Sequence, residues 1–361
     1  MNMEHTTQSR FESSATDTSA ADPSTSDASS ANETLSRSGA CEQSGLVDAV
    51  RSQVAQVVVG QDVVVERMLI ALLTGGHLLL QGVPGLAKTL MVSALARAIS
   101  LDFGRVQFTI DLLPADILGS EVLDQATGQF HINKGPIFTN LLLADEINRA
   151  APKVQSALLE AMQERRTTIG KETFSLPAPF LVIATQNPVE QAGTFELPEA
   201  QIDRFMLCHR LEYPGHTDEV RIIEQNLGLG LSRSDDGAVP QSAFDLIKDE
   251  PVASADDLTR SMSQVQEVYV SPVFVEHCVE LVRRTRECPH IELGCSPRAG
   301  IALTSAARAR AYIHDRDHVI PDDLFELAED VLLHRMRLNY NALAQGLTGR
   351  DVLQEILESL A

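Results

Sequence analysis

Short strand-like segments alternate with helix-period segments along the first half of the chain. Strand-like segments occupy residues 77–80, 105–108, 138–146, 180–185 and 206–211, and most are apolar enough to be buried on both faces. Apolar residues recur at helical spacing in residues 46–57, 62–74, 90–98 and 152–163. Strands that alternate with helices form a parallel sheet covered by helices. The pattern therefore predicts an α/β fold.

Two further segments predict β-hairpins that project from this core. Residues 121–123 and 129–132 flank a turn at Asp124–Gly128, and residues 167–176 alternate around Gly170-Lys171. The pattern leaves open whether the first hairpin contacts a substrate or is only a solvated projection.

The second half of the chain predicts helices and no further strands after Tyr213. Helical patterns occupy residues 216–229, 256–269, 272–287, 297–313 and 321–336, and a polar link covers 232–255. We expect an α/β core over residues 44–212 and a smaller α-helical lid domain over 213–361. Residues 1–43 are mainly Ser, Thr, Ala and Asp, so we expect a disordered tail that cannot bury enough apolar surface to order itself.

Composition narrows the class of protein. The 361 residues are 44% hydrophobic, which is enough for a large core in about two domains. The net charge of −21 and the absence of tryptophan argue against a large nucleic-acid footprint. No apolar run is long enough for a membrane span and the first residues lack a secretory pattern, so we expect a cytoplasmic protein. The five cysteines have no CxxC spacing and are expected to be reduced thiols.

A glycine-rich loop, GVPGLAKT at residues 82–89, follows the first buried strand and opens a helix. This order predicts a phosphate-binding P-loop, because the loop N–H groups and the helix N-terminus can face one anion. Lys88 would reach the β- and γ-phosphates of ATP, and the Thr89 hydroxyl would bind Mg²⁺. The residues expected to contact the nucleotide are Gln61, Gly82, Val83, Pro84, Gly85, Leu86, Ala87, Lys88, Thr89 and Leu90.

Two of these positions carry a second interpretation. The generic loop pattern has glycine immediately before the lysine, where this chain has Ala87. A methyl group is tolerable there with right-handed dihedral angles and costly at positive φ. Gln61 lies at a break between two helices where an adenine ring could be held, although ordinary packing is the simpler explanation of the spacing.

Polar residues follow two of the buried strands. Asp145 and Glu146 end one strand, and Asn187 follows another. In open α/β sheets, ligands bind at the carboxyl ends of the strands. We expect Asp145 to hold Mg²⁺, Glu146 to polarise the attacking water, and Asn187 to bind the γ-phosphate or the water. A plain Asn-Pro turn is the alternative for Asn187.

Two arginines are further candidates. Arg204 either pairs locally with Asp203 or Glu199, or is donated to the γ-phosphate of a neighbouring subunit. Arg298 begins a helix after Ser296-Pro297, where its charge opposes the helix dipole unless an anion such as a phosphate lies nearby.

These stretches together resemble the MoxR family of AAA+ ATPases, from about Leu46 to the C-terminus. The most specific are GVPGLAKT, FTIDLLPADILG, LLLADEINRAAPKVQSALLEAMQE, FLVIATQNPVEQAGTFELPEAQIDRF and GCSPRAGIAL. The resemblance implies that Lys88 and Thr89 are the Walker A pair, Asp145 and Glu146 Walker B, Asn187 sensor 1 and Arg298 sensor 2. It implies that Arg204 is the trans-acting arginine finger, with Arg149 as the alternative. Alanine at position 87 is usual in that family, and the hairpins resemble its helix-2 insert and pre-sensor-1 hairpin.

The resemblance also implies a function. Such proteins form rings, here expected to be hexamers, that bind ATP and Mg²⁺ between subunits. Family members often work with von Willebrand factor A-domain proteins and act like chaperones on protein clients, maturing complexes or inserting metal cofactors. The alternatives are a DNA-acting motor of the same clade, a magnesium-chelatase-like motor subunit, and a nucleotide-gated scaffold without turnover. The stretches INRAAPKVQ and ATQNPVEQ fit MoxR better than magnesium chelatase.

Overall fold

The computed structural model describes residues 45–360, except 127, 189–192, 235–236 and 248–249. The chain divides into two units, residues 1–40 and 41–361. The expected disordered tail, residues 1–43, lies outside the described residues. The description below concerns the second unit.

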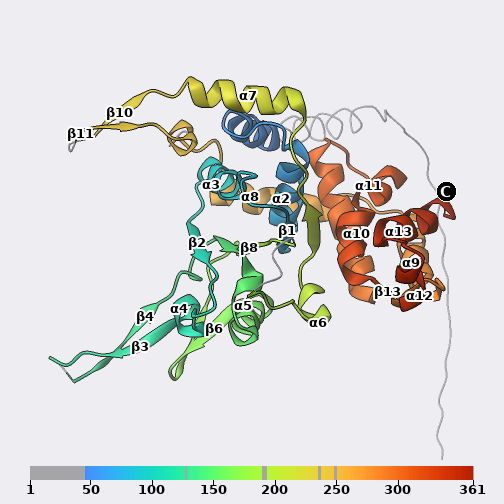
Figure 1. Ribbon diagram of the computed structural model, residues 1–361, viewed down its shortest axis with the longest axis horizontal. Helices are drawn as coiled ribbons and strands as arrows, with labels where there is room; N and C mark the ends of the chain where they lie inside the picture. The colour runs from blue at the N-terminus through green and yellow to red at the C-terminus, as the bar shows by residue number, and fades with distance from the viewer. Residues whose placement is uncertain (1–44, 127, 189–192, 235–236, 248–249, 361) are drawn as a thin grey trace, which may run out of the picture. The chain divides into compact units, whose positions relative to one another are not determined.

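A five-stranded sheet forms the centre of this unit (Figure 1). Its strands, in spatial order, are β2 (Phe103–Gln107), β5 (Leu141–Asp145), β8 (Leu181–Gln186), β1 (Leu78–Gln81) and β9 (Leu207–Arg210). All four pairings are parallel, as the predicted α/β fold requires. The central strands are apolar because helices or hairpins cover both of their faces.

Helices before and between the strands cover the sheet. They span residues 45–55, α2 (Asp62–Thr74), α3 (Lys88–Ala98), α4 (Pro114–Leu118), η1 (Ile147–Arg149), α5 (Pro152–Glu164) and α6 (Glu199–Ile202). The short α4 was not predicted, because its five residues are too few to show a helical period.

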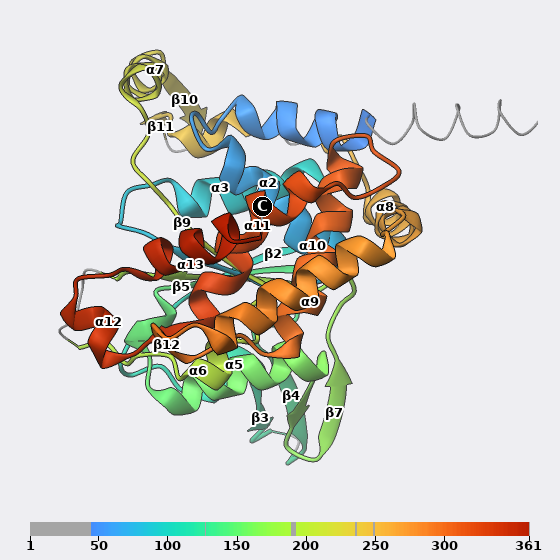
Figure 2. The ribbon, with the colours of Figure 1, turned by 90° about the vertical axis from the view of Figure 1, so that its right-hand side faces the viewer.

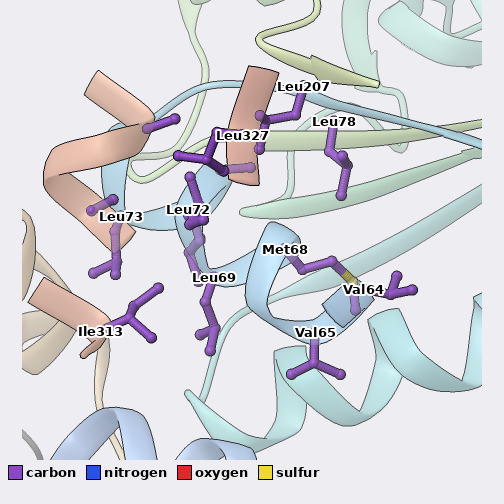
Figure 3. Packing of buried hydrophobic residues seen from close by; sticks show 14 of the residues in the cluster. Val64, Val65, Met68, Leu69, Leu72, Leu73, Leu78, Leu207, Ile313 and Leu327 are labelled. Carbon is purple, nitrogen blue, oxygen red and sulfur yellow. The ribbon is translucent and has the colours of Figure 1, made fainter. Parts of the chain in front are cut away.

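Helix α2 is the centre of the packing. It is apolar on nearly every side and every residue from Val64 to Leu73 is buried, which is typical of a helix surrounded by protein. Figure 3 shows Met68 and Leu72 of this helix among side chains from the sheet, such as Leu207, and from the C-terminal helices, such as Leu327. The α2 core therefore joins the sheet to the helices that follow it.

Buried charges reinforce this junction. Arg67 Nε of α2 lies 2.6 Å from Asp330 Oδ2, and His209 Nδ1 of β9 lies 2.9 Å from Asp330 Oδ1. Burial alone raises the pKa of Asp330, but the hydrogen bonds and charges of His209 and Arg67 outweigh it and hold that pKa below its ordinary value. Removing one partner would leave a buried charge uncompensated.

The two predicted hairpins are present. The first pairs β3 (Gly119–Leu123) with β4 (Phe130–Lys134), and the second pairs β6 (Arg166–Ile169) with β7 (Glu172–Ser175). Lys134 Nζ lies 4.9 Å from the centre of the Phe138 ring and 5.3 Å from that of Phe174. This cation–π contact joins the two hairpins.

The C-terminal half is mainly helical, as predicted. Its helices are α7 (His216–Leu227), η2 (Ala243–Leu246), α8 (Ala255–Glu267), α9 (Pro272–Glu287), α10 (Pro297–Ile313), α11 (Pro321–Leu332), η3 (Leu333–Arg335), α12 (Tyr340–Ala344) and α13 (Gly349–Glu358). The expectation of no strands after Tyr213 is wrong. Two antiparallel pairs occur, β10 (Leu231–Ser234) with β11 (Gly237–Pro240) and β12 (Ile291–Leu293) with β13 (Arg337–Leu338). Strands of two to four residues are too short to show an apolar alternation.

The predicted boundary after residue 212 stays a prediction. One hydrophobic cluster contains residues from both sides of it, including Leu78, Leu207, Leu258 and Leu327. Within the described part of the chain, no helix combines the length and the apolar character that crossing a membrane requires.

A buried histidine precedes β1. His77 Nδ1 accepts a hydrogen bond from the backbone N–H of Val182 (3.0 Å), and its Nε2 lies 3.3 Å from the carbonyl of Met162. Burial lowers the pKa of His77 to about 4, because the charged ring would lose its water and its acceptor role.

We predict that His77 makes folding sensitive to acid. The folded state favours the neutral ring, so its stabilisation is complete above the unfolded pKa of 6.5 and is lost as the pH falls toward 4. Urea unfolding from pH 7.5 to 4.5 should show a pH slope that is smaller for His77→Gln than for the unchanged protein, by about 1.4 kcal/mol per pH unit below pH 6. His131→Gln, at an exposed site of β4, should leave the slope unchanged. Equal slopes in all three proteins would contradict the prediction.

Candidate active site

The P-loop connects β1 to α3 at the carboxyl edge of the sheet. The N–H of Gly82 donates to the carbonyl of Gln186 at the end of β8 (3.1 Å). The Nζ of Lys88 donates to the carbonyl of Gly82 (2.8 Å), so the ammonium lies over the loop. Gly85 has a φ of 89°, a conformation that glycine adopts without strain. A glycine loop in front of a helix N-terminus is the arrangement that binds phosphate groups in proteins.

Ala87, immediately before α3, has a left-handed conformation with a φ of 52° and a ψ of 24°. The sequence leaves two cases for the methyl group of Ala87, tolerable with right-handed dihedral angles and costly at positive φ. The structure shows the second, strained case. An L-residue other than glycine in this region costs about 1–2 kcal/mol.

Asp145 ends β5 and is held from two sides. Thr185 Oγ1 on β8 donates to Asp145 Oδ1 (2.7 Å), and Arg105 Nη2 on β2 lies 2.7 Å from Asp145 Oδ2. The same threonine hydroxyl accepts the backbone N–H of Glu146 (2.8 Å). Thr185 therefore sets the position of both acidic residues.

Glu146 is also fixed by its neighbours. It has a left-handed backbone with a φ of 56°, which turns the chain sharply after the strand. Gln107 Nε2 on β2 donates to Glu146 Oε2 (2.9 Å), and Arg149 Nε lies 2.8 Å from the same oxygen. Arg149, the alternative arginine finger, thus lies beside the acid of its own chain.

Strand pairing places these acids near the lysine, because β1 and β5 are the two parallel neighbours of β8 and their carboxyl ends share one edge. Burial lowers the pKa of Lys88, while the charges of Asp145 and Glu146 oppose that change. Asn187, which follows β8, is buried, and its carbonyl accepts a hydrogen bond from Asn148 (3.4 Å). The structure thus brings Lys88, the acidic pair and Asn187 to one edge of the sheet.

A largely apolar cavity of about 400 Å³ adjoins the P-loop. Gln61, Leu86 and Leu90 line it from the core, together with Val57 and Ala87. Its other wall comes from Tyr213 and from α7, which contributes Ile222, Ile223 and Asn226. Its size and lining suit a planar heterocycle. Sequence reasoning placed Gln61 here but missed α7, whose adjacent isoleucines in a polar helix were the available signal.

The two candidate arginines lie at the opposite edge. Arg204 precedes the first residue of β9, whereas the P-loop follows the last residue of β1 beside it. Arg298 Nη1 is 3.9 Å from Asp203 Oδ2, and the buried Arg335 is 3.0 Å from the other oxygen of that carboxylate. Asp203 is thus an anion near the start of α10. In the described part of the chain, the Arg204 side chain has no hydrogen-bond or ion-pair partner.

Arg105, Gln107 and Thr185 are not among the site residues that the sequence predicts. Their positions in the strands could have indicated two of them, because Gln107 ends a strand and Thr185 lies one residue before the end of another. Only the register, which pairs Gln107 with Asp145, shows that β2 is next to β5.

Comparison with known proteins identifies the family. The family model described as "ATPase family associated with various cellular activities (AAA)" matches residues 77–207, and the model "AAA lid domain" matches residues 283–356. Chaperone MoxR1 of Mycobacterium tuberculosis is 42% identical over 318 residues, which cover 86% of this chain and 80% of that protein. The chain belongs to the MoxR family of AAA+ ATPases.

Further similarities agree with this assignment. YeaC of Bacillus subtilis is 43% identical over 305 residues, covering 84% of this MoxR-family chain and 91% of that protein. The crystal structure of a Cytophaga hutchinsonii protein has a TM-score of 0.80 at 40% identity and covers 91% of this chain and 98% of that one. The expected family and fold class are confirmed, and the chain is an ATPase.

We predict that Ala87→Gly stabilises the protein without nucleotide by about 1 kcal/mol, because glycine removes the strain at positive φ. The free energy of unfolding in urea measures this effect. Ala94→Gly is the matched control in the interior of α3, where glycine should destabilise by about 1 kcal/mol. A loss of stability in Ala87→Gly would contradict the left-handed conformation.

Proposed function

We propose that this chain binds Mg²⁺-ATP at the carboxyl edge of its sheet and hydrolyses it to ADP and phosphate. Subunits in a ring complete one another's sites, and hydrolysis drives chaperone-like remodelling of protein clients. The observation that carries the proposal is the separation of the candidate residues. Lys88, Asp145 and Glu146 lie at one edge of the sheet, and Arg204 and Arg298 lie at the other.

The P-loop holds the phosphates. Its N–H groups and the start of α3 face the β-phosphate, and Lys88 moves from the Gly82 carbonyl to the β- and γ-phosphate oxygens. The apolar cavity beside Gln61 and α7 takes the adenine ring.

Thr89 and Asp145 fit a magnesium ion. Both offer oxygen ligands, and Mg²⁺ in nucleotide sites typically takes one or two protein oxygens beside phosphates and water. The contacts from Thr185 and Arg105 orient the Asp145 carboxylate without closing all of its acceptor positions. When bound, the ion neutralises charge that develops on the phosphate oxygens.

Glu146 serves as the general base. Gln107 and Arg149 hold its carboxylate at the carboxyl edge, where it can accept a proton from the water that attacks the γ-phosphorus. Asn187 orients that water or the γ-phosphate from the neighbouring strand.

Arg204 and Arg298 act on the nucleotide of the next subunit. The four residues of β1 alone span about 13 Å between the two edges of the sheet. The arginines of one chain therefore lie at least one strand length from its own P-loop. A head-to-tail arrangement, which closes into a ring, brings them to a neighbour's phosphates. We expect six subunits, as the family resemblance implies.

Protein clients are favoured over nucleic acid. The net charge of −21 opposes a polyanion, and the relative from Mycobacterium tuberculosis is named a chaperone. The exposed Leu123 and Phe130 flank the turn of the first hairpin and offer apolar contacts to a client. A von Willebrand factor A-domain partner, metal cofactor insertion and a cytoplasmic location remain predictions from the sequence.

We predict that Glu146→Gln binds ATP normally but hydrolyses it at least about a hundredfold more slowly, because the base is lost. Phosphate release measures turnover, and equilibrium dialysis with ATP measures binding. Glu160→Gln, at an exposed site of α5, should retain full turnover. Near-normal hydrolysis in Glu146→Gln would remove this residue from the mechanism.

We predict that Arg204→Ala and Arg298→Ala each keep their affinity for ATP. Turnover of Arg204→Ala should fall by about a thousandfold, because this variant loses the trans-acting arginine. Arg260→Ala, at an exposed site of α8, serves as the control with full activity. The phosphate release rate measures each effect.

Mixing two inactive variants tests whether Arg204 acts in trans. Arg204→Ala subunits retain Glu146, and Glu146→Gln subunits retain Arg204. A mixture should therefore recover activity at the junctions where an intact arginine meets an intact glutamate. No recovery, with mixed assemblies confirmed by mass, would place the arginine in cis.

A further inference from the structure

An apolar groove runs between two helices of the C-terminal half. It measures about 450 Å³ and is lined by Val275 and Val279 of α9 and by Ile301 and Thr304 of α10. Ile301 is 68% exposed, and both valines are exposed as well. No described residue of the same chain fills the groove, so a row of apolar side chains faces solvent.

Helix α7 carries a matching apolar stripe. Val220, Ile223 and Leu227 stand at positions i, i+3 and i+7, and Leu227 is 79% exposed. The helix borders the apolar cavity beside the P-loop through Ile222, and Ile223 lines that cavity as well although it is 60% exposed. Gln225 Nε2 donates to the carbonyl of Gln56 (2.8 Å). The helix thus lies over this cavity, while all three residues of the stripe remain exposed and Val220 and Leu227 take no part in the cavity lining. This spacing is the one that an amphipathic helix uses to dock in a groove.

The groove continues the surface that carries the trans-acting arginines. Ile301 is three residues beyond Arg298 on α10, so the two are neighbours on that helix. If Arg298 reaches the nucleotide of the next copy, the groove beside it faces that copy too. The element that lies over that nucleotide cavity is α7. Figures 1 and 2 place α7 far from α9 within one chain, so these surfaces cannot cover each other internally.

The charges around the two surfaces are complementary. Arg283 and Arg286 line the groove near the C-terminal end of α9. Glu219 and Glu224 flank the stripe on α7. The only described ion pair of Arg283 is with Glu287 at 3.4 Å, an exposed pair that contributes little. Opposite charges beside an apolar contact favour one orientation of docking.

We propose that the groove between α9 and α10 receives the Val220–Leu227 stripe of α7 from a second copy of this chain. The inference rests on the proposed function, because it uses the same head-to-tail junction as Arg204 and Arg298. It adds a specific contact to that junction. Closing the junction would hold α7 over the nucleotide of one copy through the lid helices of the next.

Two charged variants test the contact from its two sides. Leu227→Asp alters the stripe and Ile301→Asp alters the groove, and neither residue is assigned to the nucleotide site. With ATP present, in a Glu146→Gln background, sedimentation velocity should show an assembly for the parent protein and monomers for each variant. Leu343→Asp, at an exposed apolar site of α12, is the matched control and should assemble. ATP affinity should be unchanged in all of these proteins, which excludes a folding defect.

A mixture of the two variants gives the decisive result. Leu227→Asp retains the groove and Ile301→Asp retains α7, so one sound junction can form between them. The 1:1 mixture should therefore yield dimers, because each partner blocks further growth. In chains with Glu146 restored, these dimers should recover turnover at one site. Adding Glu146→Gln to the Ile301→Asp chain should abolish that turnover, and adding it to the Leu227→Asp chain should not.

The possible failures are distinguishable. If both variants assemble like the parent, the groove inference is overturned while the trans-acting arginines stand. If the variants are monomers and their mixture forms no dimer, the pairing of groove and α7 is overturned. If the parent itself neither assembles nor depends on Arg204, the proposed function and this inference fail together.

Discussion

All five strands of the central sheet run parallel. This constraint separates the candidate site residues into two groups, one at each edge of the sheet. The residues that follow strands meet at the carboxyl edge, where the structure places Lys88, Asp145 and Glu146. Residues that precede a strand meet at the other edge, where Arg204 and Arg298 lie. Within one chain the two groups of residues are therefore separated by the length of the strands, and this separation is the basis of our proposal that a neighbouring copy supplies the arginines.

The junction between sheet and lid gives the second arginine its position. Buried contacts from α2 to Leu327 and Asp330 hold the C-terminal helices against the core. Arg335 donates to the carbonyl of Phe205 (2.7 Å) and pairs with Asp203, the partner of Arg298. Because Arg67, Asp330 and Arg335 are buried and charged, the arrangement tolerates few alternatives. The position of Arg298 therefore depends on how the C-terminal helices pack against the core, and not on α10 alone.

Most of the regular elements could be predicted because each one contains its own pattern. Helix α2 has the predicted limits of residues 62 and 74, and both hairpins lie where turns separate short runs. The P-loop was recognisable because strand, glycines, lysine and helix are consecutive. The errors fell on elements without a period of their own, such as α4 and the β12–β13 pair. These short elements depend on contacts with distant segments.

By itself, the sequence determined the class of fold, the phosphate loop and the acidic pair, since each depends on neighbours within a few residues. Tertiary structure alone decided which strands lie side by side, and so that Gln107 reaches Glu146. It also decided that α7 lines the apolar cavity beside the P-loop, that Ala87 is left-handed, and that Arg204 and Arg298 lie at the edge of the sheet opposite the P-loop. The physical reason is that periodicity records which face of an element is buried but not which partner buries it.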